Sequence, residues 1–503
     1  MLKSTTHFCK NHETFKTKLV VRAPPTMEKI RIGISMASKW TDPTMLLIMV
    51  VPSGASVLAA TGALIYHGHY LYSPIPILAS SLLYKYLYHG GDEGVKTTDY
   101  ITFHDKSLEK TYANRRYPMC ELYEDYMDGK IGFNENVEGG DCWKILQFHR
   151  DKFVNYKVTI RQIKWLLSQF IPPWLLKAGF GYGSSSFKDK ASTKKEIAEH
   201  YDRGNDFFAA FLGPSMVYTC GIFHNLKQTL EEVQFNKMNM ICQKLQLKKG
   251  ERFLDIGCGW GTLTRHAVKE FGAEGSGVTL SEEGKRWCDM KNKEENVKTE
   301  ILLMDYRDIP KTRKFHKISS IEMAEHVGLK NFVDPYLSGV HRLLEDDGMF
   351  LMQVAGLRQG SNWQDVAWGL FMSKYIFPGA DASTPLNWYI RQLELAGFEV
   401  HSVETIGRHY SHTLHKWYDN WLLHKDEIVA NDKYGPRLYR LWEFFLAWSV
   451  VAAGQGSAAC YQILAHKNRY EFPRDIWCDR AAVSGTGLVG VGAASHLDGK
   501  KAA

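Results

Sequence analysis

The chain has 503 residues, enough for two or three domains of ordinary size. Lys and Arg total 62 against 55 Asp and Glu, so the formal charge is only +7, which argues against a dedicated nucleic-acid-binding protein. Hydrophobic residues make up 45% and charged residues 23%, which excludes a disordered or fibrous protein. The nine cysteines show no C-x-x-C pair and no zinc-type spacing, so we expect neither a disulfide framework nor a structural metal.

A long stretch without charged side chains dominates the N-terminal part of the chain. From Pro43 to Tyr84, 42 residues contain no Asp, Glu, Lys or Arg, which is enough for two membrane spans of about 20 residues each. We therefore predict a transmembrane hairpin over residues 43–90. Both of its ends are expected in the cytosol, because eight Lys and Arg residues precede it in the basic segment 1–42. A single span followed by an interfacial segment and a buried hairpin of a soluble protein are the alternatives.

The remaining boundaries follow from changes in composition. Residues 91–195 are expected to form a helical, membrane-proximal region that ends in an aromatic stretch, 160–182, and a polar linker. The aromatic stretch fits either a helix lying on a bilayer surface or a core helix broken by prolines. Strands and helices then alternate over residues 196–468, which predicts an α/β domain with a parallel sheet. The small and polar residues of 469–503 predict a disordered tail.

A strand, a glycine-rich turn and a helix follow one another directly within the α/β domain. The strand RFLDI at 252–256 precedes GCGWGT at 257–262, and a helical stretch continues to Phe271. This order predicts the first unit of a doubly wound sheet, whose ligand lies over the carboxyl ends of the strands. Asp255 offers an acceptor for a ligand amine. The residues LDIGCGWGT resemble motif I of the S-adenosylmethionine-dependent methyltransferases more than a dinucleotide fingerprint, which would continue with G-x-x-G.

Four more strands, within 275–283, 301–310, 317–328 and 348–356, complete this pattern. The resemblance implies the class I methyltransferase fold, a doubly wound sheet with added helical elements. The loops at the carboxyl ends of these strands are expected to converge on one cleft. Glu282 and Glu283, after the second strand, are expected to lie in a solvated first helical turn rather than to bind a ribose.

Five motifs in the same order resemble the cyclopropane-fatty-acid synthase family. Besides LDIGCGWGT they are the segment 200–223, EMAEHVG at 322–328, KYIFPGA at 374–380 and RHYSHTLHKWYDNW at 408–421. Members of this family methylate an alkene carbon within a lipid chain. The paired N-terminal spans, the segment 368–386 and Gln353 resemble most the fungal sphingolipid C9-methyltransferases, which act on the 4,8-diene base of ceramide on the route to glucosylceramide.

For the cofactor, S-adenosylmethionine, the resemblance assigns residues around the glycine turn and after the neighbouring strands. Family members often carry Gln where this chain has Gly284, so we expect one ribose contact to be lost or supplied elsewhere. The residues implied to bind the cofactor are Tyr218, Thr219, Leu254, Asp255, Ile256, Gly257, Cys258, Gly259, Trp260, Gly261, Thr262, Thr279, Leu280, Ser281, Gly284, Tyr306 and Arg307.

The resemblance also implies the catalytic groups. Methyl transfer to an alkene leaves a carbocation, which aromatic faces stabilise and from which a base removes a proton. In the family this base is a bicarbonate ion held by a Cys, a Glu, a His, a backbone group and a Tyr. The Cys, Glu and Tyr fall on Cys220, Glu325 and Tyr410, and the His position holds Gln353. An amide donates to an anion without carrying charge, and we expect this change, with Ala355 nearby, to direct deprotonation to the alkene carbon.

The expected substrate is therefore a membrane sphingolipid, ceramide or a glucosylceramide precursor, reached from the bilayer. We expect the catalytic domain to face the cytosol and, from the pathway, the endoplasmic reticulum to be its location. A cyclopropane synthase acting on unsaturated phospholipid chains is the alternative among lipid enzymes. A small-molecule N-methyltransferase fits less well, because a soluble amine gives no reason for an anchor. A lipid-binding protein that has lost turnover is a further alternative.

Overall fold

The computed structural model describes residues 94–156, 190, 200–201, 203–358, 362–378, 380 and 384–470. The predicted hairpin at 43–90, the aromatic stretch at 160–182 and the predicted tail beyond residue 470 lie outside the described residues. Within the part of the chain that is described, no helix is both long enough and apolar enough to cross a membrane.

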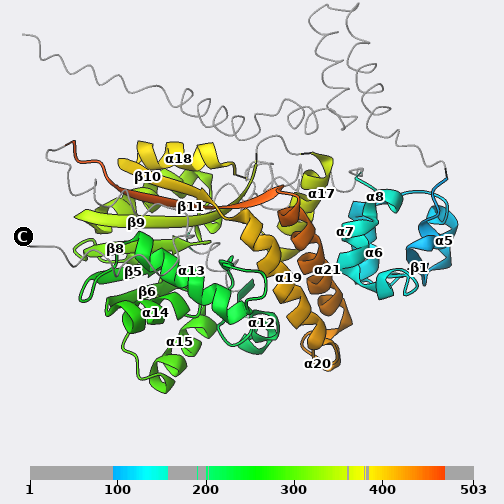
Figure 1. The fold of residues 1–503 in the computed structure, drawn as a ribbon, viewed down its shortest axis with the longest axis horizontal. Coiled ribbons are helices and arrows are strands. Elements are labelled where there is room, and N and C mark those ends of the chain that lie inside the picture. Colours follow the sequence, from blue (N-terminus) through cyan, green and yellow to red (C-terminus); the bar gives the residue numbers. More distant parts are fainter. Residues whose placement is uncertain are drawn as a thin grey trace, which may run out of the picture.

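A seven-stranded sheet forms the centre of the fold (Figure 1). Its order is β10-β11-β9-β8-β5-β6-β7, and β11 alone is reversed, pairing antiparallel with both β9 and β10. The strands are β5 (Arg252–Ile256), β6 (Glu274–Thr279), β7 (Glu300–Leu303), β8 (Phe315–Ile321), β9 (Leu344–Leu357), β10 (Phe398–Thr405) and β11 (Ala458–Lys467). The predicted α/β sheet of the class I methyltransferase type is confirmed, as a mixed sheet rather than a wholly parallel one.

Alternate residues of β5 belong to cores on opposite faces of the sheet. Phe253 lies in the core beneath α13 and α14, whereas Leu254 and Ile256 lie in the core closed by α16 and α18. The helices around the sheet are α13 (Leu230–Lys244), α14 (Thr262–Phe271), α15 (Glu282–Glu294), α16 (Ser338–Leu343) and α18 (Leu386–Leu395). Because both faces are covered, β5 reads as a nearly continuous apolar run, and ligands reach the sheet only at the ends of its strands.

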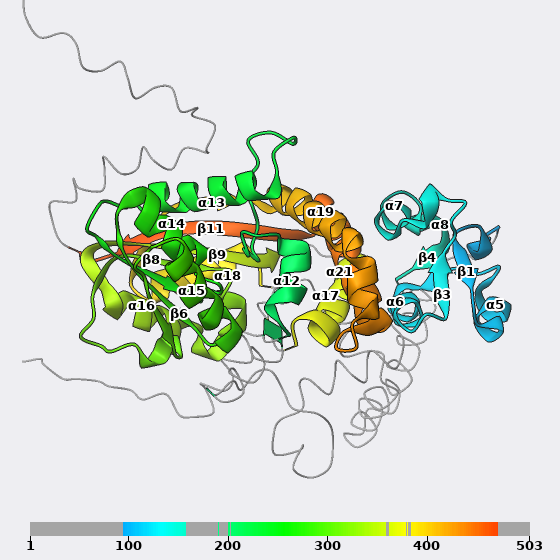
Figure 2. The same ribbon diagram turned by 90° about the horizontal axis from the view of Figure 1, so that it is seen from below.

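A layer of helices rich in aromatic residues covers one end of the sheet (Figures 1 and 2). It consists of α12 (Asn205–Leu212), α17 (Trp363–Phe371), α19 (Gly407–Leu423), α20 (Lys425–Ala430) and α21 (Gly435–Gly454). Trp417, Trp421 and Trp442 are fully buried in it and share one core with Phe207 and Phe211. Rings of this size bury roughly 150 to 250 Å² each, so the layer forms a firm wall beside the sheet.

Residues 94–156 form a small unit on the other side of α21 (Figure 2). Its helices are α5 (Lys106–Tyr112), α6 (Met119–Met127), α7 (Cys142–Phe148) and α8 (Arg150–Phe153). Two strand pairs accompany them, β1 (Ile101–Phe103) with β3 (Ile131–Phe133) and β2 (Tyr117–Pro118) with β4 (Val154–Asn155). The Tyr126 hydroxyl donates to Glu443 at 2.8 Å, and Lys374 pairs with Glu124 at 2.7 Å. These contacts attach the unit to the helical layer.

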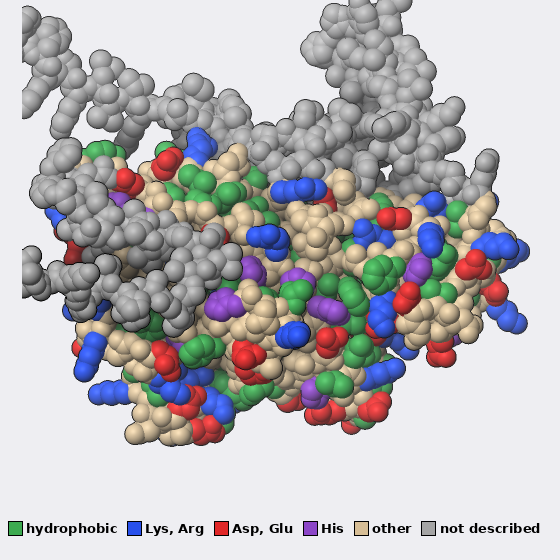
Figure 3. All heavy atoms as spheres, in the orientation of Figure 1, with side chains coloured by type: hydrophobic (Ala, Val, Ile, Leu, Met, Phe, Trp, Pro, Cys, Tyr) green, Lys and Arg blue, Asp and Glu red, His purple; other side chains and the backbone are tan. Residues whose placement is uncertain are grey.

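Charges of both signs are mixed over the face of the molecule shown in Figure 3. Lys and Arg side chains alternate there with Asp and Glu side chains and do not gather into a broad basic area. Polyanion-binding surfaces concentrate their positive charge, so this face gives no electrostatic reason to expect nucleic acid as a partner.

Candidate active site

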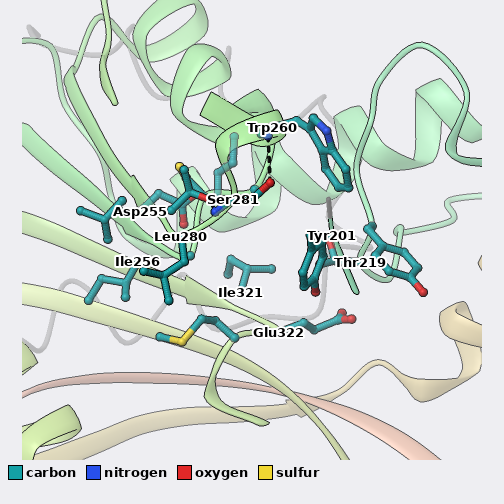
Figure 4. Close-up of a pocket in the computed structure, with 18 of the residues that line it drawn as sticks. Tyr201, Thr219, Asp255, Ile256, Trp260, Leu280, Ser281, Ile321 and Glu322 are labelled. Carbon is teal, nitrogen blue, oxygen red and sulfur yellow. Dashed lines mark hydrogen bonds between the residues drawn. The ribbon is translucent and has the colours of Figure 1, made fainter. Parts of the chain in front are cut away.

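The strand order places a pocket beside β5. β6 and β7 lie on one side of β5, and β8 and β9 lie on the other, so the winding of the chain reverses between β5 and β8. In open α/β sheets, ligands bind at the carboxyl ends of the strands where such a reversal occurs. A cavity with about 1220 Å³ of space, its open mouth included, lies at this point (Figure 4). We call it the glycine-loop pocket.

The backbone of the glycine turn explains why these positions hold glycine. Gly257 has a φ of 80° and Gly261 a φ of 71°, in the left-handed region that other residues rarely adopt. A Cβ at Gly257 would lie 2.5 Å from Met323 Cγ. At Gly284 a Cβ would lie 2.8 Å from the carbonyl oxygen of Gly259. The Gln that the family resemblance implies at this position would therefore not fit the backbone arrangement here.

The structure brings nearly all of the residues predicted to bind a cofactor to this pocket. Leu254 does not line it, because its side chain lies in the core on one face of the sheet. Gly261 does not line it either, because it caps α14 next to the Cys288 thiol. Those that do line it are Tyr218, Thr219, Asp255, Ile256, Gly257, Cys258, Gly259, Trp260, Thr262, Thr279, Leu280, Ser281, Gly284, Tyr306 and Arg307.

Two opposite charges lie within the glycine-loop pocket. Asp255 is 4% exposed and accepts a hydrogen bond from the Ser319 hydroxyl at 2.7 Å. Burial raises the pKa of this carboxyl to about 6. Lys237 is also buried and donates to the Thr219 hydroxyl, and burial lowers the pKa of its ammonium group to about 8. The pocket therefore offers groups of both signs to a ligand that carries both.

Sequence reasoning missed Lys237 and Asp305, which both line this pocket. Lys237 lies on the buried face of α13, four residues after Val233 and four before Ile241. A lysine at this spacing between apolar residues was the available signal. The Asp305 carboxylate accepts two hydrogen bonds from Arg307, one from the backbone N–H at 2.9 Å and one from Nε at 2.7 Å. This pairing fixes the predicted cofactor residue Arg307.

A second cavity opens beside the first and shares Tyr201, Tyr218, Glu322 and His326 with it. It holds about 800 Å³ of space, its open mouth included, and we call it the apolar pocket. Most of its wall comes from the helical layer and from the ends of β9 and β11. Its other lining residues include Ala355, Trp368, Met372, Phe377, Leu414, Trp417, Phe445, Ala453 and Ala459. Such a wall suits a hydrocarbon chain.

The predicted catalytic residues converge on Glu322, which sequence reasoning did not select. The backbone N–H of Cys220 donates to Glu322 Oε1 at 2.9 Å, and Gln353 Nε2 donates to the same oxygen at 2.6 Å. The Tyr410 hydroxyl donates to Oε2 at 2.8 Å. The Cys460 thiol lies 3.6 Å from Oε1. Figure 4 shows the Glu322 side chain near Tyr201 and Thr219, at the side of the pocket away from Asp255.

Cys220 takes part through its backbone rather than its thiol. Its Sγ is directed to the carbonyl oxygens of Gly221, at 3.3 Å, and Ile406, at 3.7 Å. Burial raises the pKa of the thiol well above its ordinary value, so it is not a nucleophile at neutral pH. The resemblance implies that Cys220 holds a bound anion; in the structure its backbone N–H donates to Glu322.

A chain of hydrogen bonds fixes the amide of Gln353. Lys244 Nζ donates to Gln462 Oε1 at 2.7 Å, and Gln462 Nε2 donates to Gln353 Oε1 at 2.8 Å. A lysine ammonium only donates, so the polarity of both amides is determined. The NH₂ group of Gln353 must therefore face Glu322.

Glu325 lines the apolar pocket next to Glu322, as predicted for a residue at the end of the fourth strand. Its Oε1 accepts from the Ala355 N–H at 2.5 Å, and among the described residues its Oε2 has no partner. Burial, followed by the nearby charge of Glu322, raises the pKa of Glu325 to about 8.

The backbone of Glu322 is unusual. Its φ is 50°, in the left-handed region, and its N–H donates to the carbonyl oxygen of Gln353 at 2.7 Å. For a residue other than glycine this conformation costs roughly 1 to 3 kcal/mol, and such strain is often found at active sites. The sequence signal was the pair of acids three residues apart in EMAE, of which only Glu325 was chosen.

The comparisons with known proteins agree with this geometry. A family model described as mycolic acid cyclopropane synthetase matches residues 188–463. Sphingolipid C9-methyltransferase 2 of Gibberella zeae is 43% identical over 376 residues, which cover 73% of this chain and 68% of that protein. Sphingolipid C9-methyltransferase B of Emericella nidulans is 43% identical over 407 residues, which cover 80% of this chain and 75% of that protein.

A solved structure is similar over the same region. The mycolic acid cyclopropane synthase CmaA1, complexed with SAH and CTAB, has a TM-score of 0.52 and 25% identity, and the match covers 56% of this chain and 99% of that one. The chain therefore belongs to the mycolic acid cyclopropane synthetase family and, at this identity and coverage, groups with its sphingolipid C9-methyltransferases.

Proposed function

We propose that the chain is an enzyme that transfers a methyl group from S-adenosylmethionine to C9 of a 4,8-diene sphingoid base in ceramide or a related sphingolipid, in glucosylceramide biosynthesis. The observation that carries this proposal is the junction of the two pockets at Tyr201, Tyr218, Glu322 and His326. A polar methyl donor and a lipid chain would meet there. The names of the relatives at 43% identity support the choice of lipid.

The residues of the glycine-loop pocket fit S-adenosylmethionine. When bound, this cofactor supplies an electrophilic methyl group on a sulfonium sulfur. Asp255 and Lys237 offer both charge signs to a ligand with an amino group, a carboxylate and a sulfonium. Gly257 lets the backbone approach the ligand closely, since it carries no Cβ. The CmaA1 structure complexed with SAH supports this assignment.

The apolar pocket serves to hold the alkene. An isolated alkene is a weak nucleophile, so it reacts only when it is held in line with the methyl group at about 3 Å and kept away from water. Tyr218, Trp417 and Phe377 line the pocket with aromatic faces. Such faces stabilise the carbocation that methyl addition leaves on the neighbouring carbon.

The position of the lost proton decides the product. Loss of a proton from the added methyl group closes a cyclopropane ring. Loss of the proton from C9 restores the double bond and leaves a methyl branch. In the proposed reaction C9 loses its proton and the product is a methyl-branched alkene, which the names of the relatives support.

The proposal includes a membrane anchor at 43–90, a membrane of the endoplasmic reticulum and a catalytic domain that faces the cytosol. The 42 uncharged residues from Pro43 to Tyr84 support the anchor. A substrate that stays in the bilayer supplies the reason for one, because an anchored enzyme searches in two dimensions.

The test is mass spectrometry of lipids after the membrane-reconstituted full chain has received S-adenosylmethionine with a trideuterated methyl group. A 4,8-diene ceramide and an unsaturated phospholipid are offered together. Three deuteriums on the sphingoid base are the expected result. Two deuteriums on a phospholipid acyl chain would instead identify a cyclopropane synthase. Labelling of neither lipid would contradict both functions.

A further inference from the structure

The anion site that the family resemblance implies is filled by a side chain of this protein. Three groups expected to hold bicarbonate are the Cys220 backbone N–H, Gln353 Nε2 and the Tyr410 hydroxyl, and all three donate to Glu322. A bicarbonate ion at this place would have to displace a carboxylate of the same charge. The residues at this site therefore do not fit bicarbonate.

We propose that Glu322 is the general base of the reaction and takes the place of a bound anion. The inference rests on the proposed function, because it concerns the proton lost after methyl transfer. Glu322 lines both pockets, so its carboxylate lies where the methyl donor and the alkene would meet. Glu325 lines only the apolar pocket.

The hydrogen bonds of Glu322 leave it able to accept a proton. Cys220, Gln353 and the Cys460 thiol are all directed to Oε1. Oε2 receives only the Tyr410 hydroxyl among these groups. A carboxylate oxygen has two acceptor positions, so Oε2 retains one for a substrate proton.

The groups that hold Glu322 suit this role. Its donors from Gln353 and Tyr410 are neutral, so they orient the carboxylate without forming an ion pair with it. Burial, followed by the nearby charge of Glu322, raises the pKa of the neighbouring Glu325 to about 8.

The strained backbone gives independent support. Glu322 adopts a φ of 50°, where glycine would be free of strain, and the chain nevertheless places a carboxylate there. Its N–H is fixed by the carbonyl oxygen of Gln353, whose amide also holds the side chain. The backbone of Gln353 thus holds the backbone of Glu322, and the Gln353 side chain holds the Glu322 carboxylate.

Methyl transfer and loss of the proton are two successive steps. The π pair of the alkene forms the bond from C9 to the methyl carbon, while the bond between that carbon and sulfur breaks and its pair remains on sulfur. C8 is left with the positive charge. The C9–H bond then breaks, its pair forms the new C8–C9 double bond, and the proton moves to Glu322 Oε2. Glu322 returns the proton to water after the product has left.

The first experiment compares the wild-type full chain in carbonate-free buffer, under argon, with the same chain in added sodium bicarbonate. The expected result is the same rate of formation of the methylated sphingoid base in both. A rate that falls at least tenfold without bicarbonate, and returns when it is added, would overturn the proposal. This measurement does not depend on the folding of any variant.

The second experiment uses two substitutions at the same position. Glu322→Gln keeps the shape and removes the base, and kcat should fall by about 100-fold or more, with S-adenosylhomocysteine affinity by calorimetry unchanged. Glu322→Gly suits the φ of 50° and frees the three donors. Added bicarbonate should therefore raise the rate of this variant at least tenfold. Glu109→Gln, at an exposed position on α5, is the matched control.

These outcomes separate the inference from the proposed function. If the wild-type chain methylates no sphingolipid, the proposed function fails and the role of Glu322 fails with it. If the wild-type chain makes the methyl-branched base but Glu322→Gln keeps more than a tenth of its kcat, only the inference fails. A Glu322→Gly variant that binds S-adenosylhomocysteine but does not respond to bicarbonate would also contradict it.

Discussion

Glu325 should make the protein less stable as the pH rises, and the substitution Glu325→Gln should remove this effect. The side chain is 6% exposed, and burial raises its pKa from 4.5 to about 8. Between these two values the folded chain keeps a proton that the unfolded chain has released. Raising the pH therefore stabilises the unfolded state relative to the folded state, and the free energy of unfolding falls.

The size of the effect follows from the pKa difference. Each pH unit between the two pKa values changes the free energy of unfolding by about 1.4 kcal/mol. From pH 5 to pH 7.5 the sum is roughly 3 kcal/mol, which is a large part of the stability of an ordinary domain. Gln in place of Glu325 does not titrate, and its amide oxygen still accepts from the Ala355 N–H.

The assay is denaturant unfolding of the full chain in detergent at pH 5 and pH 7.5, for the wild type and Glu325→Gln. Asp255 has a raised pKa too, but it contributes equally to both proteins, so the difference between them isolates Glu325. Between pH 5 and pH 7.5, we expect the free energy of unfolding of the variant to rise by roughly 3 kcal/mol relative to that of the wild type. Parallel pH curves for the two proteins would refute the reasoning, and Glu109→Gln should give such a parallel curve.

Substitutions at the glycine turn and at two donors to Glu322 give further tests. Gly257→Val should abolish S-adenosylhomocysteine binding by calorimetry, because a Cβ there would lie 2.5 Å from Met323 Cγ; wild-type affinity would contradict this. Tyr410→Phe removes a donor to Glu322 and should lower kcat by about tenfold with KM unchanged, so a change in KM alone would count against it. Gln353→His should move part of the product from three deuteriums to two when the methyl donor is trideuterated, and an unchanged product would remove the role assigned to the amide.

The sequence predicted the sheet and the glycine-loop pocket because both depend on local patterns. A strand, a glycine turn and a helix in direct order have few structural solutions, and the pocket position follows from the winding of the chain. Leu254 was assigned to the cofactor with its neighbours, yet it does not line the pocket. It shares a core with Ile256, but it lies two residues before the end of β5, whereas the pocket opens at the carboxyl end of the strand.

The role of Glu322 depends on contacts that no local pattern contains. Tyr410 and Cys220 are 88 and 102 residues away in the sequence, and both reach the same carboxylate. Both Glu322 and Glu325 follow β8 closely, so their spacing does not tell which one meets the donors. The choice is made by the φ of 50° at Glu322, a backbone conformation that is not expected for glutamate.

The role of Gln353 depends on Glu322, to which its amide donates. As a replacement for histidine at a bicarbonate site, the amide is a loss, since it cannot offer a positive charge to an anion. Beside a fixed carboxylate, a protonated histidine would form an ion pair and make that carboxylate a weaker base. Gln353 still gives the hydrogen bond at 2.6 Å, and Gln462 keeps its NH₂ group facing Glu322. An acid at 322 and a neutral donor at 353 therefore belong to one arrangement, in which the protein itself supplies the base and orients it through uncharged donors.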